Sequence, residues 1–249
     1  NNLVELLREQ WRVRPSYVPG DVSVQRLADA ATKWGALFGV DNLWVGCPLV
    51  VHRRCLEPMF GVANRIAYGR MMVHGRKPDD KFVPLFGESA WAHVDAPVTS
   101  ENWIAEEGRL AVEMAQLAWR LGEEKSLFII TPFRSVADEL KDLLSATLGT
   151  KADAWIKRSV GTVHTFQGKE NANVVLVLGG DTQKPGVRGF VADEPNLLNV
   201  ALTRAKERVY VVGNATFWQG KESLRILAHS VQTFGRVLTA DSFRRNWRS

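Results

Sequence analysis

Short apolar runs alternate with helical apolar stripes along this chain. Three runs, Leu127–Thr131, Asn173–Leu178 and Val209–Val212, are apolar at almost every position instead of every second one. Such runs are typical of strands buried on both faces of a parallel sheet. Between them, apolar residues recur at spacings of three and four, as on one face of a helix. The alternation predicts an α/β protein with a doubly wound, mainly parallel sheet and helices on both of its faces.

The same pattern places the other elements. Further strands are expected at Leu49–Val51, Trp91–Val94 and Val160–Val163. The expected helices are Asp21–Gly39, Met59–Tyr68, a Ser100-capped helix with a stripe from Ile104 to Leu121, a helix from Val136 to Leu148, and Asn196–Ala205. After the last strand, helices are expected to continue to about residue 237.

No flexible linker interrupts the pattern after residue 20, so one domain is the simplest division. Residues 1–20 begin a helical pattern that prolines and a glycine break. We expect them to be a connection from a first domain that this chain lacks. The domain itself is expected to cover residues 21–240, and the basic residues 241–249 are expected to form a frayed, solvated tail.

Composition narrows the class of protein only a little. The 249 residues carry a net charge of +5, which permits a polyanionic partner without requiring one. No apolar run approaches the roughly 20 residues of a membrane-spanning helix, and residues 1–20 do not have the character of a signal peptide. The two cysteines, Cys47 and Cys55, suggest neither a metal site nor a disulfide framework. We therefore expect a cytoplasmic protein without a membrane partner.

The chain has no Walker A loop, the G-x-x-x-x-G-K-[ST] motif that binds phosphates. Gly168–Glu170 and Gly220–Glu222 contain its Gly-Lys pair but lack the upstream glycine and the hydroxyl that would bind magnesium. No cluster of histidine, cysteine and carboxylate residues suggests a metal site. The sequence therefore contains no complete catalytic centre.

Arginines nevertheless stand where they could bind an anion. Arg204 is near the end of the expected helix Asn196–Ala205, and Arg53 and Arg54 directly follow an expected strand. A guanidinium binds oxyanions through two parallel hydrogen bonds and stays charged at any working pH. Taken singly, each of these arginines is explained at least as well as a solvated surface residue.

Four segments resemble motifs of the superfamily-1 helicases, in the branch that includes the nonsense-mediated-decay helicase. GTVHTFQGKE (Gly161–Glu170) and NLLNVALTRA (Asn196–Ala205) look like motifs V and VI. LFIITPFR (Leu127–Arg134) is similar to motif IV, and VHRRCLEPMFGVANRIAY (Val51–Tyr68) looks like a variant of the Q-Y-R-M-H-P segment. The order and approximate separations of the motifs also match, from about residue 45 to residue 214.

This resemblance implies a second RecA-like domain, the half of a two-domain motor that has no Walker loops. ATP and Mg²⁺ would be bound mainly by the absent first domain, in the cleft between the two. Arg54 and Arg204 would be arginine fingers, and Gln167 would couple the nucleotide state to movement. Gly168 would present a backbone N–H near the γ-phosphate, and Glu170 would accept a hydrogen bond from the ribose. A helix-start carboxylate or a salt bridge to a lysine is the alternative explanation of Glu170.

One departure from the family concerns Arg53. The family has an aromatic residue at this place that stacks on adenine, and an arginine can stack through its planar guanidinium. Whether Arg53 or Arg54 is the finger stays open, because the alignment can slip by one residue.

The resemblance also implies a single-stranded DNA or RNA partner that crosses both domains. Thr131, Thr162 and His164 lie where motifs IV and V of the family meet the nucleic-acid backbone. Short hydroxyls at strand ends suit phosphate contacts that read no sequence. Capping or turn stabilisation explains the two threonines nearly as well.

Together these features predict the C-terminal motor domain of an ATP-dependent helicase or translocase. The complete protein is expected to hydrolyse ATP, whereas this chain alone is expected to be inactive. Two alternatives remain, a nucleic-acid-binding module without catalysis and a protein-interaction scaffold with a RecA-like fold. The joint presence of Gln167, Glu170 and Arg204 weighs against the scaffold, which needs none of them.

Overall fold

The computed structural model divides the chain into two compact units, Asn1–Val51 and His52–Ser249. It describes residues 29, 31–38, 43–46, 50–184, 186–192, 195–234 and 236–247. The connection expected at residues 1–20 therefore lies outside the described residues. The larger unit begins at His52, not at residue 21, and it extends past residue 240. Among the helices described, none has the length and apolar character needed to pass through a bilayer.

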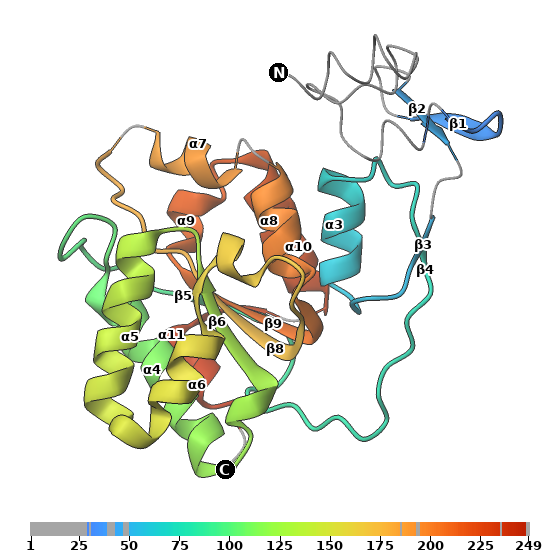
Figure 1. Ribbon diagram of the computed structural model, residues 1–249. Helices are drawn as coiled ribbons and strands as arrows, with labels where there is room; N and C mark the ends of the chain where they lie inside the picture. The colour runs from blue at the N-terminus through green and yellow to red at the C-terminus, as the bar shows by residue number, and fades with distance from the viewer. Residues whose placement is uncertain are drawn as a thin grey trace, which may run out of the picture. The chain divides into compact units, whose positions relative to one another are not determined.

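The larger unit is built around a sheet of six strands (Figure 1). Every pairing between neighbouring strands is parallel. From one edge of the sheet to the other, the strands are β10 (Arg236–Thr239), β5 (Ala90–His93), β9 (Ala205–Gly213), β8 (Asn171–Val177), β6 (Leu127–Thr131) and β7 (Val160–Thr162). The parallel α/β fold predicted from the uninterrupted apolar runs is confirmed.

Helices pack on both faces of this sheet (Figure 1). One face carries α4 (Ala105–Arg120), α5 (Arg134–Leu148) and α11 (Ala240–Arg244), and the other carries α3 (Met59–Ile66), α8 (Pro195–Leu202) and α10 (Glu222–Phe234). The shorter elements are β3 (Val51–His52), β4 (Val73–His74), α6 (Asp153–Ser159), α7 (Val187–Ala192), α9 (Ala215–Trp218) and the 3-10 helices η2 (Glu124–Ser126), η3 (Thr150–Ala152) and η4 (Val163–Phe166).

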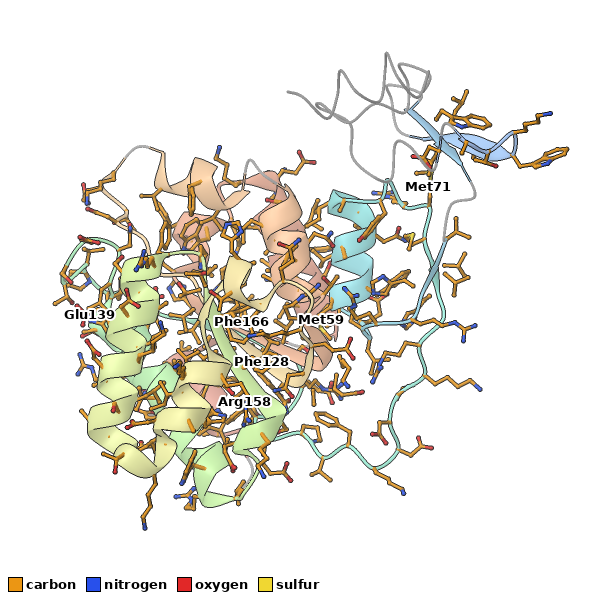
Figure 2. All side chains as sticks on the ribbon, viewed as in Figure 1. Met59, Met71, Phe128, Glu139, Arg158 and Phe166 are labelled. Carbon is orange, nitrogen blue, oxygen red and sulfur yellow. The ribbon has the colours of Figure 1, made fainter. Side chains whose placement is uncertain are left out.

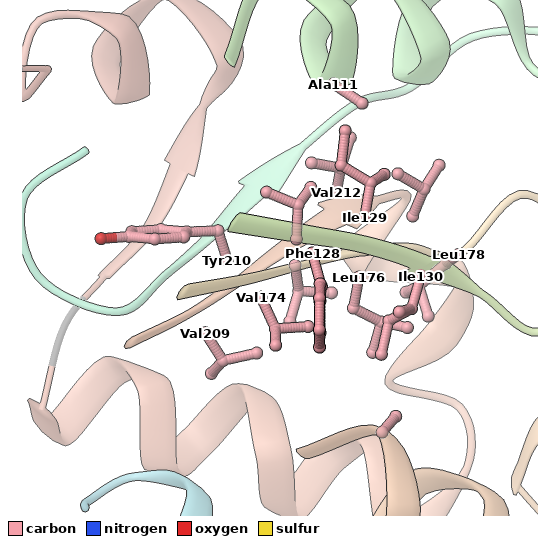
Figure 3. Close-up of a cluster of buried hydrophobic side chains, with 14 of the residues drawn as sticks. Ala111, Phe128, Ile129, Ile130, Val174, Leu176, Leu178, Val209, Tyr210 and Val212 are labelled. Atoms are coloured by element: carbon pink, nitrogen blue, oxygen red, sulfur yellow. The ribbon is translucent and has the colours of Figure 1, made fainter. Parts of the chain in front are cut away.

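Side chains of the central strands alternate between the two helical layers (Figure 3). Ile129 points toward α4, where Ala111 lies, whereas Phe128, Val174 and Val209 point to the opposite face. All five side chains are buried. Each large apolar side chain buried in this way stabilises the fold by about 1.5–3 kcal/mol. Covering both faces with helices therefore explains why successive strand positions are apolar.

In the smaller unit, β1 (Gly35–Phe38) pairs with β2 (Leu43–Gly46) in an antiparallel hairpin. The helix expected at Asp21–Gly39 is therefore wrong over Gly35–Phe38, and most of the rest of it lies outside the described residues. A spacing of four, as between Trp34 and Phe38, puts two residues on one face of a helix and equally on one face of a strand. Pairing with β2, which the periodicity does not show, decides between the two.

Two further expectations about boundaries are wrong. Ser100 does not cap α4; it forms an isolated bridge with Trp103, and the helix begins at Ala105 without a side-chain cap. The short strand expected near residue 50 exists as β3, but it pairs with β4 and does not join the main sheet. In both places a contact with a neighbouring segment determines the boundary.

The described C-terminal residues, as far as Trp247, are part of the folded unit, so the expectation of a frayed tail is wrong for them. Residues 236–239 form the edge strand β10, and α11 follows it directly. Phe243 is fully buried, with its ring 5.9 Å from that of Tyr210. Arg244 is not a free basic residue, because its Nε lies 2.6 Å from the Glu113 carboxylate of α4. This contact raises the pKa of Arg244.

Replacing Phe243 with alanine is expected to lower the free energy of unfolding by about 3–5 kcal/mol, the usual cost of removing a large aromatic side chain from a core. Urea unfolding followed by circular dichroism measures the change. Arg245→Ala is the matched control, because the Arg245 side chain is exposed and its removal should leave the midpoint nearly unchanged. Equal midpoints for the two variants would show that α11 does not contribute to the core.

Candidate functional site

Residues 163–170 run back along the sheet from the carboxyl end of β7 to the amino end of β8. β7 ends at Thr162 and β8 begins at Asn171. The two strands are parallel and lie on either side of β6, so the residues between them run back along β6 from one end of the sheet to the other. Phe166 attaches this segment to the sheet. Its buried ring lies 4.7 Å from the ring of Phe128 (Figure 2).

The residues that follow Phe166 are open to solvent. Gln167, Gly168 and Glu170 are all exposed. Gly168 has a φ of +86°, in the left-handed region that favours glycine. A Cβ at this position would meet nothing within 4 Å. The backbone at Gly168 therefore leaves room for a ligand to approach closely.

Arg204 lies in the turn between α8 and β9. The helix expected over residues 196–205 ends at Leu202, and the strand begins at Ala205, earlier than expected. Arg204 Nε donates to the carbonyl oxygen of Val200 at 2.9 Å. The last carbonyl oxygens of a helix have no backbone N–H to accept from. The Arg204 side chain supplies a donor for one of them, the carbonyl oxygen of Val200, so the end of α8 is satisfied without a glycine or proline cap.

The Arg204 guanidinium joins the two segments that resemble motifs V and VI. Nη1 donates to the carbonyl oxygens of Phe166 at 3.3 Å and Lys169 at 2.8 Å. Nη2 donates to the hydroxyl of Thr203 at 3.2 Å. The residue is only 4% exposed. These acceptors are all neutral, so Arg204 positions the exposed loop without having its charge cancelled by a direct carboxylate partner.

Arg54 and Glu170 lie near this guanidinium, and Lys206 pairs with Glu170. The Glu170 carboxylate is 3.7 Å from Arg54 Nε and 3.6 Å from Lys206 Nζ. The Leu56 N–H donates to the Lys206 carbonyl at 3.1 Å, which holds the segment after β3 against the start of β9. Burial lowers the pKa of Arg204. The positive charge of Arg54 lowers this pKa further, whereas the Glu170 carboxylate raises it. Arg204 still keeps its charge at any working pH.

The pair of Arg54 and Glu170 is accessible, because each side chain is 47% exposed. Exposed ion pairs contribute only about 0–1 kcal/mol, so an oxyanion can replace Glu170 as the partner of Arg54. The salt bridge to a lysine, the alternative given for Glu170, is also present through Lys206. Arg53 is exposed as well, but it is Arg54 that lies next to Glu170.

The residues expected to bind nucleic acid lie at the opposite, carboxyl end of the sheet. Thr131 and Thr162 are partners on the adjacent strands β6 and β7. Thr131 is fully buried, and its hydroxyl accepts the N–H of Phe133 at 3.3 Å, which favours the turn-stabilising alternative for this residue. The hydroxyls of Thr162 and Thr165 lie 3.0 Å apart, and His164 is exposed.

A histidine–cysteine pair next to Arg54 was missed from the sequence. His52 Nε2 lies 3.0 Å from Cys55 Sγ, and His74 Nε2 lies 3.1 Å from the Cys55 carbonyl oxygen. Burial raises the pKa of the Cys55 thiol to about 12, and burial together with the charge of Arg54 lowers the pKa of His52. At neutral pH the thiol is therefore not a nucleophile. Across the described residues, no three His, Cys, Asp or Glu side chains gather as a metal site.

A buried ion pair also connects distant segments. Arg76, in the loop after β4, pairs with Glu207 of β9, and both side chains are largely buried. Arg208 next to it lies 3.1 Å from Glu88 and 5.6 Å from the ring of Phe82. These contacts hold the segment between β4 and β5 against β9. The sequence shows a basic loop around Arg76, but its partner is 131 residues away.

Glu107, in the first turn of α4, is a fully buried carboxylate. Its Oε2 accepts the N–H of Gly179 at 2.8 Å, and its Oε1 has no partner among the described residues. Burial raises the pKa of Glu107 to about 8. The sequence did contain a signal, because Glu107 precedes Leu110 by three residues and so interrupts the apolar stripe of the helix.

Matches in sequence agree with the family that the motifs resemble. A family model described as an AAA domain matches residues 86–216, more than half of the chain. The regulator of nonsense transcripts 1 homolog of Neurospora crassa is 34% identical over 86 residues, and the ATP-dependent helicase upf1 of Schizosaccharomyces pombe is 35% identical over 86 residues. Each alignment covers 34% of this chain, which spans only 8% and 9% of the length of these relatives. A solved structure, the C-terminal domain of a possible DNA helicase from Lactobacillus plantarum, aligns at a TM-score of 0.43 and 15% identity, over 74% of this chain and 98% of that one.

Arg204→Ala is expected to lower the free energy of unfolding by about 1–3 kcal/mol, because the carbonyl oxygens of Phe166 and Lys169 lose their donor. Arg54→Ala is the matched control, since its solvent-exposed pair contributes at most about 1 kcal/mol. Chemical unfolding of both variants measures the difference. A smaller loss for Arg204→Ala than for Arg54→Ala would contradict the positioning role of Arg204.

Glu107 is expected to make stability depend on pH. Its pKa rises from the ordinary 4.5 to about 8 on folding, so the folded state holds an extra proton between these values. The stabilisation by this proton is complete below about pH 4.5 and is lost as the pH rises through about 8. From pH 5 to pH 8, the free energy of unfolding should fall by a few kcal/mol relative to Glu107→Gln, which has no titratable group here. Urea unfolding at several pH values measures it, and parallel pH profiles for the two proteins would contradict the assignment.

Proposed function

Because the chain belongs to the AAA domain family, in the superfamily-1 helicase branch of the nonsense-mediated-decay helicases, we propose that it is the second RecA-like domain of an ATP-dependent helicase or translocase. The observation that carries the proposal is the joint position of Arg54, Glu170 and Arg204 at the amino ends of β8 and β9, next to the open backbone of Gly168. The first RecA-like domain, with its Walker loops, is the partner that this arrangement requires.

Arg54 is the arginine finger that reaches the phosphates first. Its partner Glu170 is exposed and weakly bound, so phosphate oxygens can replace the carboxylate. Arg204 is the second finger, and it has to exchange the carbonyl oxygens of Phe166 and Lys169 for phosphate oxygens. A charged acceptor makes the stronger hydrogen bond to a guanidinium, so this exchange is favourable. Both arginines stabilise negative charge that develops during phosphoryl transfer.

The other residues of the site orient the nucleotide. Glu170, released from Arg54, accepts a hydrogen bond from the ribose, and the planar guanidinium of Arg53 stacks on the base. Gly168 leaves room for the phosphates near its backbone. Bound ATP supplies the phosphoryl group. Mg²⁺ is bound mainly by the first domain, which carries the Walker loops in the family that the motifs resemble.

Single-stranded DNA or RNA binds at the carboxyl end of the sheet, where Thr162 and His164 contact its backbone. Thr131, which is buried, acts there by shaping the turn after β6. Residues 163–170 connect this end of the sheet with the nucleotide end. A shift of that segment on binding nucleic acid therefore reaches Gln167, which gives a physical route for coupling the two ligands.

In the complete protein, Arg54→Ala is expected to lower kcat for ATP hydrolysis by about 10³-fold, the lower limit found for arginine fingers. Arg54→Lys should not restore the rate, because an ammonium cannot form the forked contact. Steady-state ATPase assays with single-stranded DNA and RNA measure this. By itself, the chain should show no appreciable ATPase activity.

Arg158→Ala is the matched control, since Arg158 is an exposed arginine on α6 (Figure 2). Arg53→Ala should mainly raise KM for ATP, because base stacking contributes to binding and not to the chemical step. If Arg54→Ala and Arg158→Ala hydrolyse ATP equally fast, Arg54 is not a finger. If only Arg53→Ala lowers kcat, then Arg53 is the arginine finger.

A further inference from the structure

Phe190 is an exposed aromatic side chain that the proposed function leaves unexplained. It lies on α7, and 52% of it is exposed. Its ring stacks on that of Phe133, with centroids 5.5 Å apart and an interplanar angle of 28°. Phe133 itself is buried. One face of Phe190 is thus supported by a fixed ring, and the rest of its surface is open to solvent.

This aromatic pair lies at the carboxyl end of the sheet. Phe133 follows the last residue of β6 by two positions, and a Cβ at Gly179, just after β8, would lie 3.7 Å from the Phe133 ring. Thr162, paired with Thr131 across β6 and β7, is at the same end. The platform of Phe133 and Phe190 is therefore at the edge where the proposed nucleic-acid contacts lie.

The groups around the platform are polar. Arg134, next to Phe133, has a side chain that is 92% exposed and lies 3.7 Å from Asp138. Lys184 lies 3.5 Å from Asp181 in the loop before α7. Both cations lie in solvent-exposed ion pairs, which phosphate oxygens can replace as at Arg54, so they can hold the backbone of a strand beside the platform. A contact to the base itself would add to these phosphate contacts.

We propose that the exposed face of Phe190 stacks on an unpaired base of single-stranded nucleic acid, with Phe133 as its support. The inference rests on the proposed function and adds a base contact to the backbone contacts. Every base has a flat π face, so such stacking tolerates any sequence. A duplex keeps its bases stacked on one another, so the platform selects single strands.

The surroundings of Phe190 do not fit a protein partner. The fully buried core of a protein interface is enriched in apolar and aromatic side chains, and large exposed apolar patches mark such sites. Among the described residues, the other large exposed apolar side chains all precede residue 84, from Trp34 to Val83. In the part of the chain that the structure describes, Phe190 is the one large exposed apolar side chain at this end of the sheet, where Thr162, Thr165 and His164 also lie. A single aromatic ring among such groups suits a nucleobase next to its phosphate.

The test compares binding of the chain to labelled oligothymidylate, oligouridylate and an abasic strand of equal length, at low salt. Phe190→Ala should weaken binding of the base-containing strands by roughly five- to a hundredfold. Phe190→Leu, which keeps an apolar side chain without a ring, should lose nearly as much, whereas Phe190→Trp should bind at least as tightly. On the abasic strand, Phe190→Ala and the unaltered chain should bind equally.

Val83→Ala is the matched control, because Val83 is exposed to a similar extent but lies between β4 and β5. Equal affinity of Phe190→Ala and the unaltered chain for oligothymidylate overturns the inference, as does an equal loss on the abasic strand. If the unaltered chain binds none of the strands, the proposed binding of nucleic acid at this edge is wrong, and the stacking inference is overturned with it. Circular dichroism of each variant shows whether the chain is still folded.

Discussion

The hydrogen bonds of the Arg204 guanidinium to neutral acceptors are the interaction on which the site depends. They join the turn before β9 to the loop before β8, two segments that are 38 residues apart at Phe166. Without them the exposed loop from Gln167 to Glu170 would be held by the buried ring of Phe166 and by the exposed ion pairs of Glu170. Because the acceptors are carbonyl and hydroxyl oxygens, the loop is positioned while the guanidinium keeps a charge that an anion can use.

The parallel sheet separates two kinds of ligand chemistry. Its amino end holds Arg54, Glu170 and Arg204, which suit a nucleotide brought by another domain. Its carboxyl end holds hydroxyls and the aromatic platform of Phe133 and Phe190, which suit a single strand. Parallel strands make this separation unavoidable, since all their amino ends meet at one edge and all their carboxyl ends at the other. Residues 163–170 bridge the two edges, so this segment connects the proposed nucleotide site with the proposed nucleic-acid site.

The sequence predicted best where one short segment carries the information. Continuous apolar runs identified the central strands, and the motif segments contain Arg54, Glu170 and Arg204, which lie close together in the fold. Predictions failed where the deciding contact is distant in the chain. Pairing of β1 with β2 replaced an expected helix, and burial of Phe243 against the sheet made an expected tail part of the core.

The sequence by itself therefore determined the α/β class, the order of its main elements and the family, because periodicity and motif residues are local properties. Tertiary structure decided which side chains are free to act. It buried Thr131 and most of Arg204, left Arg54 half exposed, and raised the thiol pKa of Cys55 beyond any nucleophilic role. Burial depends on neighbours brought together by the whole sheet, and no residue's own position in the chain encodes it.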